Sequence, residues 1–137
     1  MWRVVLDPGV LVAALISKKG APAQILLWWR SGRFELIVSP LLLRELGKVL
    51  TRHKFRRYVS LDEAEQYVRM ILRGATLVED PPEPPPLTPD PGDDYLMALA
   101  SAAGARFLVS GDPHLTELAV PVPPVLTPRA FLDRLLR

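Results

Sequence analysis

The chain contains no cysteine among its 137 residues, and this absence excludes several kinds of chemistry. Without cysteine there is no disulfide, no thiolate nucleophile and no zinc site built on cysteine ligands. No apolar stretch reaches the roughly 18 uninterrupted residues that a membrane span requires. The N-terminal segment also lacks the apolar core and small-residue cleavage site of a signal peptide. We therefore predict a cytoplasmic protein with no membrane partner.

Asparagine is absent as well, and lysine is scarce, with 4 residues against 13 arginines. This depletion of thermolabile side chains, together with 15 prolines, fits a thermophile, although the base composition of a genome gives the same bias. The hydrophobic share of 49% and the charged share of 23% indicate a globular chain rather than a disordered one. The length favours a single domain over residues 1–137.

The formal net charge is only +2, yet cations are concentrated in one run at residues 52–57. Such a run can hold the phosphates of a nucleic acid. The side chains that would do so are Arg52, Lys54, Arg56 and Arg57. Taken alone, the run is better explained by a solvated helix end.

Short β-type runs alternate with helical patterns along the chain. Strands are predicted over residues 2–6, 34–38, 76–78, 106–109 and 122–126, the last as an edge strand that tolerates its prolines. Helices are predicted over residues 21–30, from Pro40 onward, and over 61–72, 94–103 and 128–136, with a further apolar segment at 10–16. Residues 80–91 carry seven prolines and are expected to form a stiff crossover. The alternation predicts an α/β fold, a three-layer sandwich with a mostly parallel central sheet.

Acidic residues occupy comparable places in this pattern. Asp7 and Asp112 each follow an apolar run, Asp93 and Asp94 open a helical run, and Glu45 lies in the helix after the second strand. The carboxyl ends of parallel strands share one edge of the sheet, where open α/β folds place their sites. Carboxylates about 4 Å apart repel by roughly 4 kcal/mol at a protein-like dielectric constant, so a cluster requires a cation or a bound proton. Mg²⁺ or Mn²⁺ there activates water and stabilises charge on a phosphodiester.

Each acid also has a structural explanation when it is taken singly. Asp7 and Asp112 precede prolines and resemble helix N-caps. Asp93 and Asp94 lie in a first turn, where the helix dipole favours negative charge by roughly 0.3–1 kcal/mol. Glu45 flanks an apolar helical face and can simply be solvated. Their shared edge favours a metal site, because capping alone does not require these carboxylates to meet.

Four segments, taken in order, resemble the acidic motifs of the PIN-domain family. The chain is most similar to the small prokaryotic PIN proteins of the VapC type, which are the toxin components of toxin–antitoxin pairs. Order and spacing match over essentially the whole chain, so the resemblance implies a PIN-like, Rossmann-like fold. The segments are Val4-Val5-Leu6-Asp7, residues 39–46 around Glu45, residues 90–100 with Asp93 and Asp94, and Leu108-Val109-Ser110-Gly111-Asp112.

The resemblance implies a metal-dependent endoribonuclease that hydrolyses RNA phosphodiester bonds with Mg²⁺ or Mn²⁺. Ser110 takes the hydroxyl position near the metal, and the run at residues 52–57 holds the RNA backbone. The implied protein partners are a cognate antitoxin and a second copy of the chain in a homodimer. The catalytic and metal-binding residues implied are Asp7, Glu45, Asp94 and Asp112, with Asp93 as an adjacent acid that assists or substitutes.

One departure from the family pattern concerns the two residues after Asp7. The first motif usually continues with threonine or serine and then asparagine, whereas this chain has Pro8 and Gly9. Loss of such supporting groups costs roughly 10–100-fold in affinity or activity at metal sites. The alternative prediction is therefore a catalytically weakened PIN fold that acts as an RNA- or protein-binding module.

Other chemistries fit the sequence less well. His53 and His114 lack a metal-binding spacing, and no phosphate-cradling glycine motif occurs. Asp7 would suit an aspartyl-phosphate nucleophile only with a second aspartate two residues later, where the chain has glycine. Trp28 and Trp29 are expected in the core or, if exposed, at a dimer or antitoxin contact.

Overall fold

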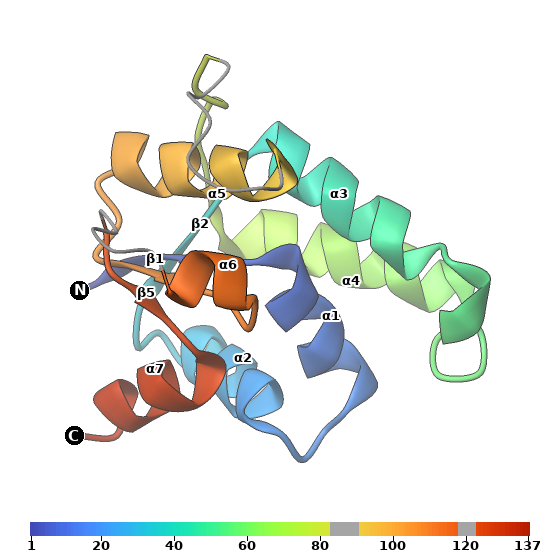
Figure 1. Ribbon diagram of the computed structural model, residues 1–137. Coiled ribbons are helices and arrows are strands. Elements are labelled where there is room, and N and C mark those ends of the chain that lie inside the picture. Colours follow the sequence, from blue (N-terminus) through green and yellow to red (C-terminus); the bar gives the residue numbers. More distant parts are fainter. Residues whose placement is uncertain (83–90, 118–122) are drawn as a thin grey trace.

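The computed structural model describes residues 1–82, 91–117 and 123–137, and of residues 91–94 it describes the backbone alone. Five strands form one parallel sheet in the order β3-β2-β1-β4-β5, and helices cover both faces (Figure 1). This arrangement confirms the predicted α/β fold, a three-layer sandwich around a parallel sheet. The strands are β1 (Arg3–Leu6), β2 (Glu35–Val38), β3 (Thr76–Leu77), β4 (Phe107–Val109) and β5 (Val125–Leu126).

The central strand β1 is buried on both faces, which explains its uninterrupted apolar sequence. Val4 and Val5 are fully shielded from solvent, and Leu6 is nearly so. β1 pairs with β2 on one side and with β4 on the other, and Val4 lies opposite both Leu36 and Phe107. Parallel strands covered by helices are apolar throughout because neither face meets water.

Four helices begin after a side chain that caps them and is followed by proline. Asp7, Ser39, Asp112 and Thr127 each accept a hydrogen bond from a backbone N–H in the following first turn. Proline fits the first helical position because its missing N–H would have had no partner there. The helices are α1 (Pro8–Ile16), α2 (Ala21–Arg30), α3 (Pro40–Leu50), the 3₁₀ helix η1 (His53–Phe55), α4 (Leu61–Gly74), α5 (Pro91–Ala102), α6 (Pro113–Thr116) and α7 (Pro128–Leu135).

Some element boundaries differ from the sequence prediction for local reasons. The apolar segment at 10–16 is helical, and α1 starts at Pro8 because Asp7 caps it. The helix predicted over residues 61–72 continues for two more residues and ends at Gly74. Helix α5 begins at Pro91 rather than at Asp94. The short helices η1 and α6 have no periodic pattern that could reveal them.

Two predicted elements fall partly outside the described residues. The proline-rich crossover predicted over 80–91 includes residues 83–90, which are not described. The edge strand predicted over 122–126 includes residue 122, which is not described either, and the strand that the structure shows is Val125–Leu126.

Aromatic rings join the C-terminal helix to the sheet. Phe131 of α7 lies edge-on to Phe34 and to Phe107, with ring centroids 5.3 and 5.9 Å apart. Trp2 meets Phe107 edge-on at 5.1 Å. Such pairs contribute about 0.5–1.5 kcal/mol beyond the apolar area they bury.

Helices α3 and α4 pack side by side and project from the sheet to the η1 turn at their far end (Figure 1). Helix α3 buries Leu42, Leu46 and Leu50, which recur every fourth residue along one face. Tyr67 of α4 donates its hydroxyl to the carbonyl of Leu11 at 2.6 Å and so ties α4 to α1. The projecting helix pair is therefore anchored to the core along one side.

Helices α1 and α2 form the first helical pair of the chain, and α1 also packs against α3. Within the described ranges, no single helix is long and apolar enough to cross a membrane. Helices α1 and α2 meet the length and composition only when taken together, and they are bent by 97° at the break between them. In α2, Trp29 is buried, whereas Trp28 is partly exposed and lies beneath Arg33.

Candidate functional site

The pairing of β1 with β4 places Asp7 and Ser110 side by side at the carboxyl edge of the sheet. Leu6 lies opposite Val109 in the register, so the next residue of each strand leaves the sheet at the same point. The N–H of Asp7 donates to the carbonyl of Val109 at 2.9 Å, which extends the pairing by one residue. The predicted meeting of the first and fourth acidic segments at one edge therefore follows directly from the topology.

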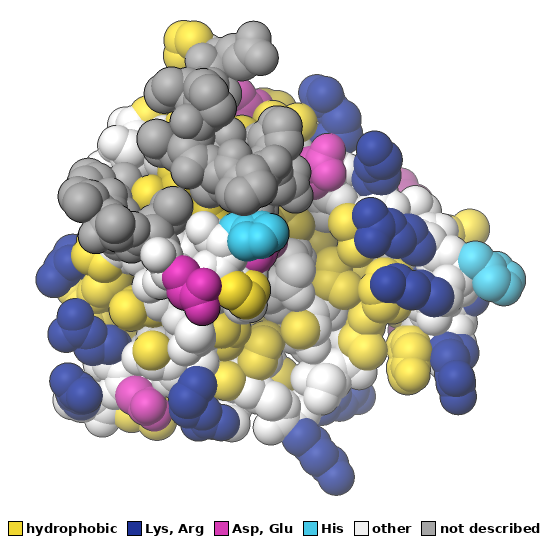
Figure 2. Space-filling view, viewed as in Figure 1, with side chains coloured by type: hydrophobic (Ala, Val, Ile, Leu, Met, Phe, Trp, Pro, Cys, Tyr) yellow, Lys and Arg dark blue, Asp and Glu magenta, His cyan; other side chains and the backbone are white. Residues whose placement is uncertain are grey.

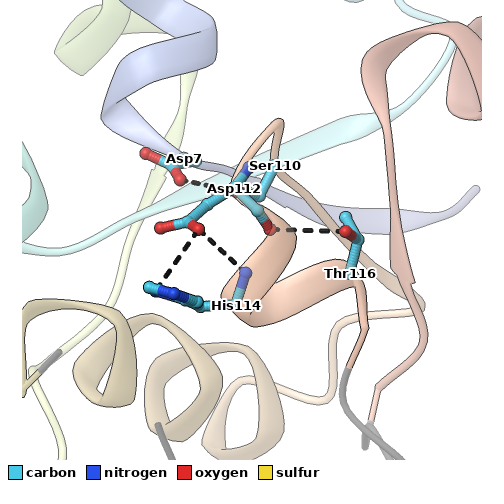
Figure 3. A network of polar contacts seen from close by, with 5 residues as sticks. All are labelled: Asp7, Ser110, Asp112, His114 and Thr116. Carbon is cyan, nitrogen blue, oxygen red and sulfur yellow. Dashed lines mark hydrogen bonds and ion pairs between the residues drawn. The ribbon is translucent and has the colours of Figure 1, made fainter. Parts of the chain in front are cut away.

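Asp7, Ser110 and Asp112 form a connected polar network at this edge (Figure 3). The hydroxyl of Ser110 donates to Asp7 Oδ2 at 2.7 Å and accepts from the N–H of Asp112 at 3.0 Å. Ser110 is completely buried, so its hydroxyl is shielded from water and bonds to these two neighbours instead. The other oxygen of Asp7, Oδ1, accepts the N–H of Gly9 at 2.8 Å. The serine thus fixes the orientation of one carboxylate and the backbone of the other.

The electrostatics of Asp7 set it apart from a surface carboxylate. Burial raises the pKa of Asp7, and the neighbouring negative charge of Asp112 raises it further. The hydrogen bonds from Gly9 and Ser110 act in the opposite direction on the pKa but do not cancel the effect of burial. A carboxylate in this position is stabilised by a nearby cation, because a cation offsets both the lost hydration and the repulsion from Asp112.

His114 lies on the outer side of the network. Its backbone N–H donates to Asp112 Oδ1 at 2.9 Å, and its ring Nδ1 lies 3.8 Å from the same oxygen (Figure 3). The side chain of His114 is more than half exposed. In the sequence, His114 lacks a second histidine at a metal-binding spacing. Its position two residues after Asp112 is the one sequence feature that indicates a place near this network.

An open pocket of about 340 Å³ lies against this network. Both carboxylates line it, so a ligand in the pocket meets Asp7 and Asp112 together. Gly9 leaves the space beside Asp7 open, because a side chain there would meet only Asp7 Oδ1, at an ordinary contact distance of 3.5 Å. The remaining lining residues are Val10, Ala13, Pro22, Gly111 and Pro128.

The other predicted site acids are less fully placed. Glu45 is partly buried on α3, and α3 packs against α1, the helix that Asp7 caps. Asp93 and Asp94 belong to the first turn of α5, but their side chains lie outside the described residues. Among the side chains that are described, no three acids or histidines lie close enough together to hold a metal ion. Among the described side chains, the structure therefore brings together Asp7, Ser110 and Asp112.

The donor chemistry of the edge fits a hard divalent cation. Asp7 and Asp112 offer carboxylate oxygens, the ligand type that Mg²⁺ and Mn²⁺ prefer. Burial raises the pKa of Asp7, so a cation bound beside this carboxylate would stabilise its charged form. With no cysteine in the chain, soft-metal chemistry has no thiolate ligand.

The basic run at residues 52–57 divides into two kinds of side chain. Arg52, Lys54 and Arg57 are exposed, and Lys54 and Arg57 lie over the rings that follow them. Arg56 instead donates Nη2 to the carbonyl of Leu50, while its Nε and Nη1 are buried and have no hydrogen-bond partner among the described residues. Three of the four cations thus face solvent, and the fourth closes the end of α3.

One contact at the carboxyl edge has no sequence signal. Asp80, which follows β3, accepts the N–H of Leu41 at 2.9 Å and so caps the start of α3 together with Ser39. Its second oxygen, Oδ1, is buried without a partner among the described residues. This contact joins residues 39 positions apart in the chain, a separation at which local patterns carry no information.

Comparison with known proteins places the chain among structurally similar molecules. A family model described as the PIN domain matches residues 3–114. The crystal structure of PAE2754 from Pyrobaculum aerophilum has a TM-score of 0.67 and 18% identity, covering 98% of this chain and 96% of that one. The crystal structure of VapBC2 from Rickettsia felis, bound to a DNA fragment from their promoter, has a TM-score of 0.64 and 11% identity, covering 91% of this chain and 98% of that one. A search of curated proteins found no match.

Proposed function

The chain belongs to the PIN-domain family, and from that premise we propose that it is a metal-dependent endoribonuclease that hydrolyses RNA phosphodiester bonds. The observation that carries the proposal is the pairing of Asp7 with Asp112 through buried Ser110, beside an open pocket. Helix capping accounts for the hydrogen bond that one carboxylate oxygen of each aspartate accepts. It does not explain why both acids line the same pocket.

The residues of the network have distinct roles in this proposal. Asp7 and Asp112 would hold Mg²⁺ or Mn²⁺, and Glu45 and Asp94 would complete the acidic set, with Asp93 assisting. A bound divalent cation supplies activation of water and stabilisation of charge on the phosphodiester. Ser110 holds the Asp7 carboxylate at a fixed angle, which lowers the loss of side-chain freedom when a ligand binds. Arg52, Lys54 and Arg57 would bind the RNA backbone away from the reacting bond.

We further propose that the chain is the toxin of a toxin–antitoxin pair that acts in the cytoplasm. The likeness to a VapBC2 structure supports this proposal at the level of the fold, and a cognate antitoxin is the partner expected from it. A homodimer is the second assembly that we expect. Size measurement of the purified chain, alone and with the product of a neighbouring reading frame, tests both partners.

The alternative function is a PIN fold that binds RNA or protein without cleaving it. The observation that favours it is the start of α1. There Gly9 contributes only its backbone N–H, and residues 8 and 9 give the pocket no side-chain amide or hydroxyl. Under this alternative the chain binds RNA with equal affinity in the presence and absence of divalent cations.

The decisive experiment is RNA cleavage with Mg²⁺, with Mn²⁺ and with a chelator, by the wild-type chain and by Asp7→Asn and Asp112→Asn. Asp133→Asn is the matched control, because Asp133 is an exposed acid of α7. The proposal requires metal-dependent cleavage that the two site variants lose and the control keeps. Glu45→Gln and Asp94→Asn then test the acids whose contacts are not established. Absence of cleavage by folded wild-type protein under every condition would favour the binding module.

A further inference from the structure

Helix α3 carries a row of exposed cations outside the basic run already considered. Arg44 and Lys48 are exposed on α3, and Arg52 continues the same spacing just beyond its end. Residues four apart lie above one another on a helix, so Arg44 and Lys48 follow one line, with a rise of about 6 Å between them. Arg52 lies beyond Leu50, the last residue of α3, where the chain turns into η1. We call Arg44, Lys48 and Arg52 the α3 basic row.

One member of the α3 basic row, Lys48, lies beside Glu45. It follows Glu45 by three residues within α3, which makes the two side chains neighbours on one helical face. Helix α3 starts at the carboxyl edge, where Ser39 caps it, and runs outward to η1 (Figure 1). Figure 2 shows Lys and Arg side chains gathered over this projecting part of the molecule. The row therefore leads from the acidic edge toward the tip.

The cations of the row have no acidic partner in the part of the chain that is described. Arg3 and Arg69 form ion pairs with Glu35 and Glu65, whereas no such pair includes any member of the row. Like charges along the row repel one another modestly in water and attract any anion with a matching charge spacing. The row is thus a set of unsatisfied positive charges rather than part of a surface salt-bridge network.

The outer end of the row is held in place by hydrogen bonds. The Thr51 hydroxyl donates to the carbonyl of Lys48 at 2.8 Å, and the N–H of Arg52 donates to the carbonyl of Val49 at 3.1 Å. The guanidinium of Arg56 binds the carbonyl of Leu50 from the other side. The backbone that carries Arg52 is therefore ordered before any ligand arrives, which reduces the entropy lost on binding.

We propose that the α3 basic row binds successive phosphates of an RNA strand and guides the strand from the acidic edge toward η1. The spacing of about 6 Å between residues four apart is comparable with the spacing of phosphates along an extended strand. The inference deepens the proposed function, since it rests on RNA as the substrate and specifies how an extended strand is held.

The test measures RNA binding without cleavage. A labelled single-stranded RNA of about ten nucleotides is titrated with the Asp112→Asn chain by fluorescence anisotropy over a range of salt concentrations. The same titration is made with the row variant, in which Arg44→Gln, Lys48→Gln and Arg52→Gln are added together to the Asp112→Asn chain. The matched control combines Arg30→Gln, Arg73→Gln and Arg137→Gln, three exposed arginines that lie outside the row and form no ion pair with the described residues. Circular dichroism melts confirm that all three proteins are folded.

The row variant is expected to bind the RNA at least about tenfold more weakly at low salt. Each phosphate contact contributes roughly 0.7 to the slope of log affinity against log salt for single strands, so the slope should fall by roughly 2 in magnitude. The control variant should keep both the affinity and the slope. Equal losses in the two variants, or an unchanged slope in the row variant, would overturn the proposal and leave the row to a protein partner.

This result is separable from the nuclease assignment. If wild-type protein cleaves no RNA but the row variant loses binding, the row inference stands and the protein is a binding module. If wild-type protein cleaves RNA and the row variant binds RNA as tightly as the control does, the nuclease stands and the row inference fails.

Discussion

The Ser110 hydroxyl lies 2.7 Å from Asp7 Oδ2 and donates a hydrogen bond to it, across the junction of β1 and β4. The serine is completely buried. If its hydroxyl is removed, a water molecule would have to enter the core to replace this hydrogen bond. The geometry and protonation of the first site acid therefore depend on a residue of the fourth segment.

Ser110→Ala should shift the acid limb of the pH–activity profile to higher pH and lower the activity at neutral pH. The bond from Ser110 lowers the pKa of Asp7, so its loss adds to the rise that burial already causes. Cleavage rates measured across the pH range check this. Thr116→Val is the control, because the Thr116 hydroxyl donates to the backbone carbonyl of Asp112, at 3.4 Å, rather than to a site carboxylate, and should leave the profile unchanged.

Asp7→Asn should abolish cleavage yet raise the melting temperature at neutral pH. The folded-state pKa of Asp7 lies above its ordinary value of 3.8, so the folded chain holds this proton more tightly than the unfolded chain. Stability associated with Asp7 is thus fully present below pH 3.8 and is lost as the pH rises through the folded-state pKa.

Melting curves of the two proteins in chelator, recorded across the pH range, test this stability effect. The advantage of the variant should shrink as the pH falls toward 3.8. Mg²⁺ should raise the melting temperature of the wild type only. A variant that is less stable than the wild type at neutral pH in chelator contradicts the expectation.

Gly9→Asn should strengthen metal binding and cleavage. A Cβ at Gly9 meets only Asp7 Oδ1, at 3.5 Å, and the backbone there is not left-handed, so the fold accepts a side chain. A supporting amide beside a metal ligand contributes roughly 10–100-fold. Mn²⁺ affinity measured by calorimetry gives the answer, with Gly9→Ala as the control for the change in backbone freedom. Identical affinities for Gly9→Asn and Gly9→Ala would refute the role of the amide.

Gly74→Ala should destabilise the fold by about 1–3 kcal/mol. A Cβ on this last residue of α4 would lie 2.9 Å from the buried ring of Trp29, so the ring or the helix must move. Gly47→Ala is the opposite case, since a Cβ in the middle of α3 meets nothing within 4 Å. There alanine should stabilise by up to about 1 kcal/mol through its helix propensity. Urea unfolding followed by tryptophan fluorescence distinguishes the loss of stability expected for Gly74→Ala from the gain expected for Gly47→Ala.

Arg56→Ala should lower stability by about 1–2 kcal/mol and leave RNA affinity nearly unchanged. Its guanidinium binds the carbonyl of Leu50 and is partly buried, so it acts within the fold. Arg57→Ala should lower RNA affinity and leave stability nearly unchanged, because Arg57 is exposed beside Tyr58. Unfolding and RNA-binding measurements on both variants decide the matter, and an RNA-binding loss confined to Arg56→Ala would be contrary to the structure.

The strand pattern was sufficient to predict that Asp7 and Asp112 meet, because acids that follow apolar runs in a βα alternation lie at one edge once the strands are parallel. The place of Ser110 beside them was implied by the resemblance to the PIN-domain family and not by the pattern alone. The helix starts were predictable for the same local reason, since Ser39 and Thr127 cap helices that proline opens.

The remaining features depend on contacts between distant segments. Asp80 caps α3 from a position 39 residues away, and nothing in its neighbourhood distinguishes it from a loop acid. Arg56 belongs to a run of cations, and only the packing of the turn after α3 decides that it faces inward rather than outward. The position of Glu45 relative to Asp7 likewise depends on how α3 packs against α1.

The strand order also determines when during synthesis the candidate site can come into being. β1 lies between β2 and β4, so its second edge stays open until a segment about a hundred residues downstream arrives. Asp7 and Ser110 are 103 positions apart, and closing so long a loop is among the late and slow events of folding. A nascent chain that has not yet been synthesised as far as β4 therefore carries the first aspartate without its serine, and an interrupted translation product ending before β4 has no assembled site.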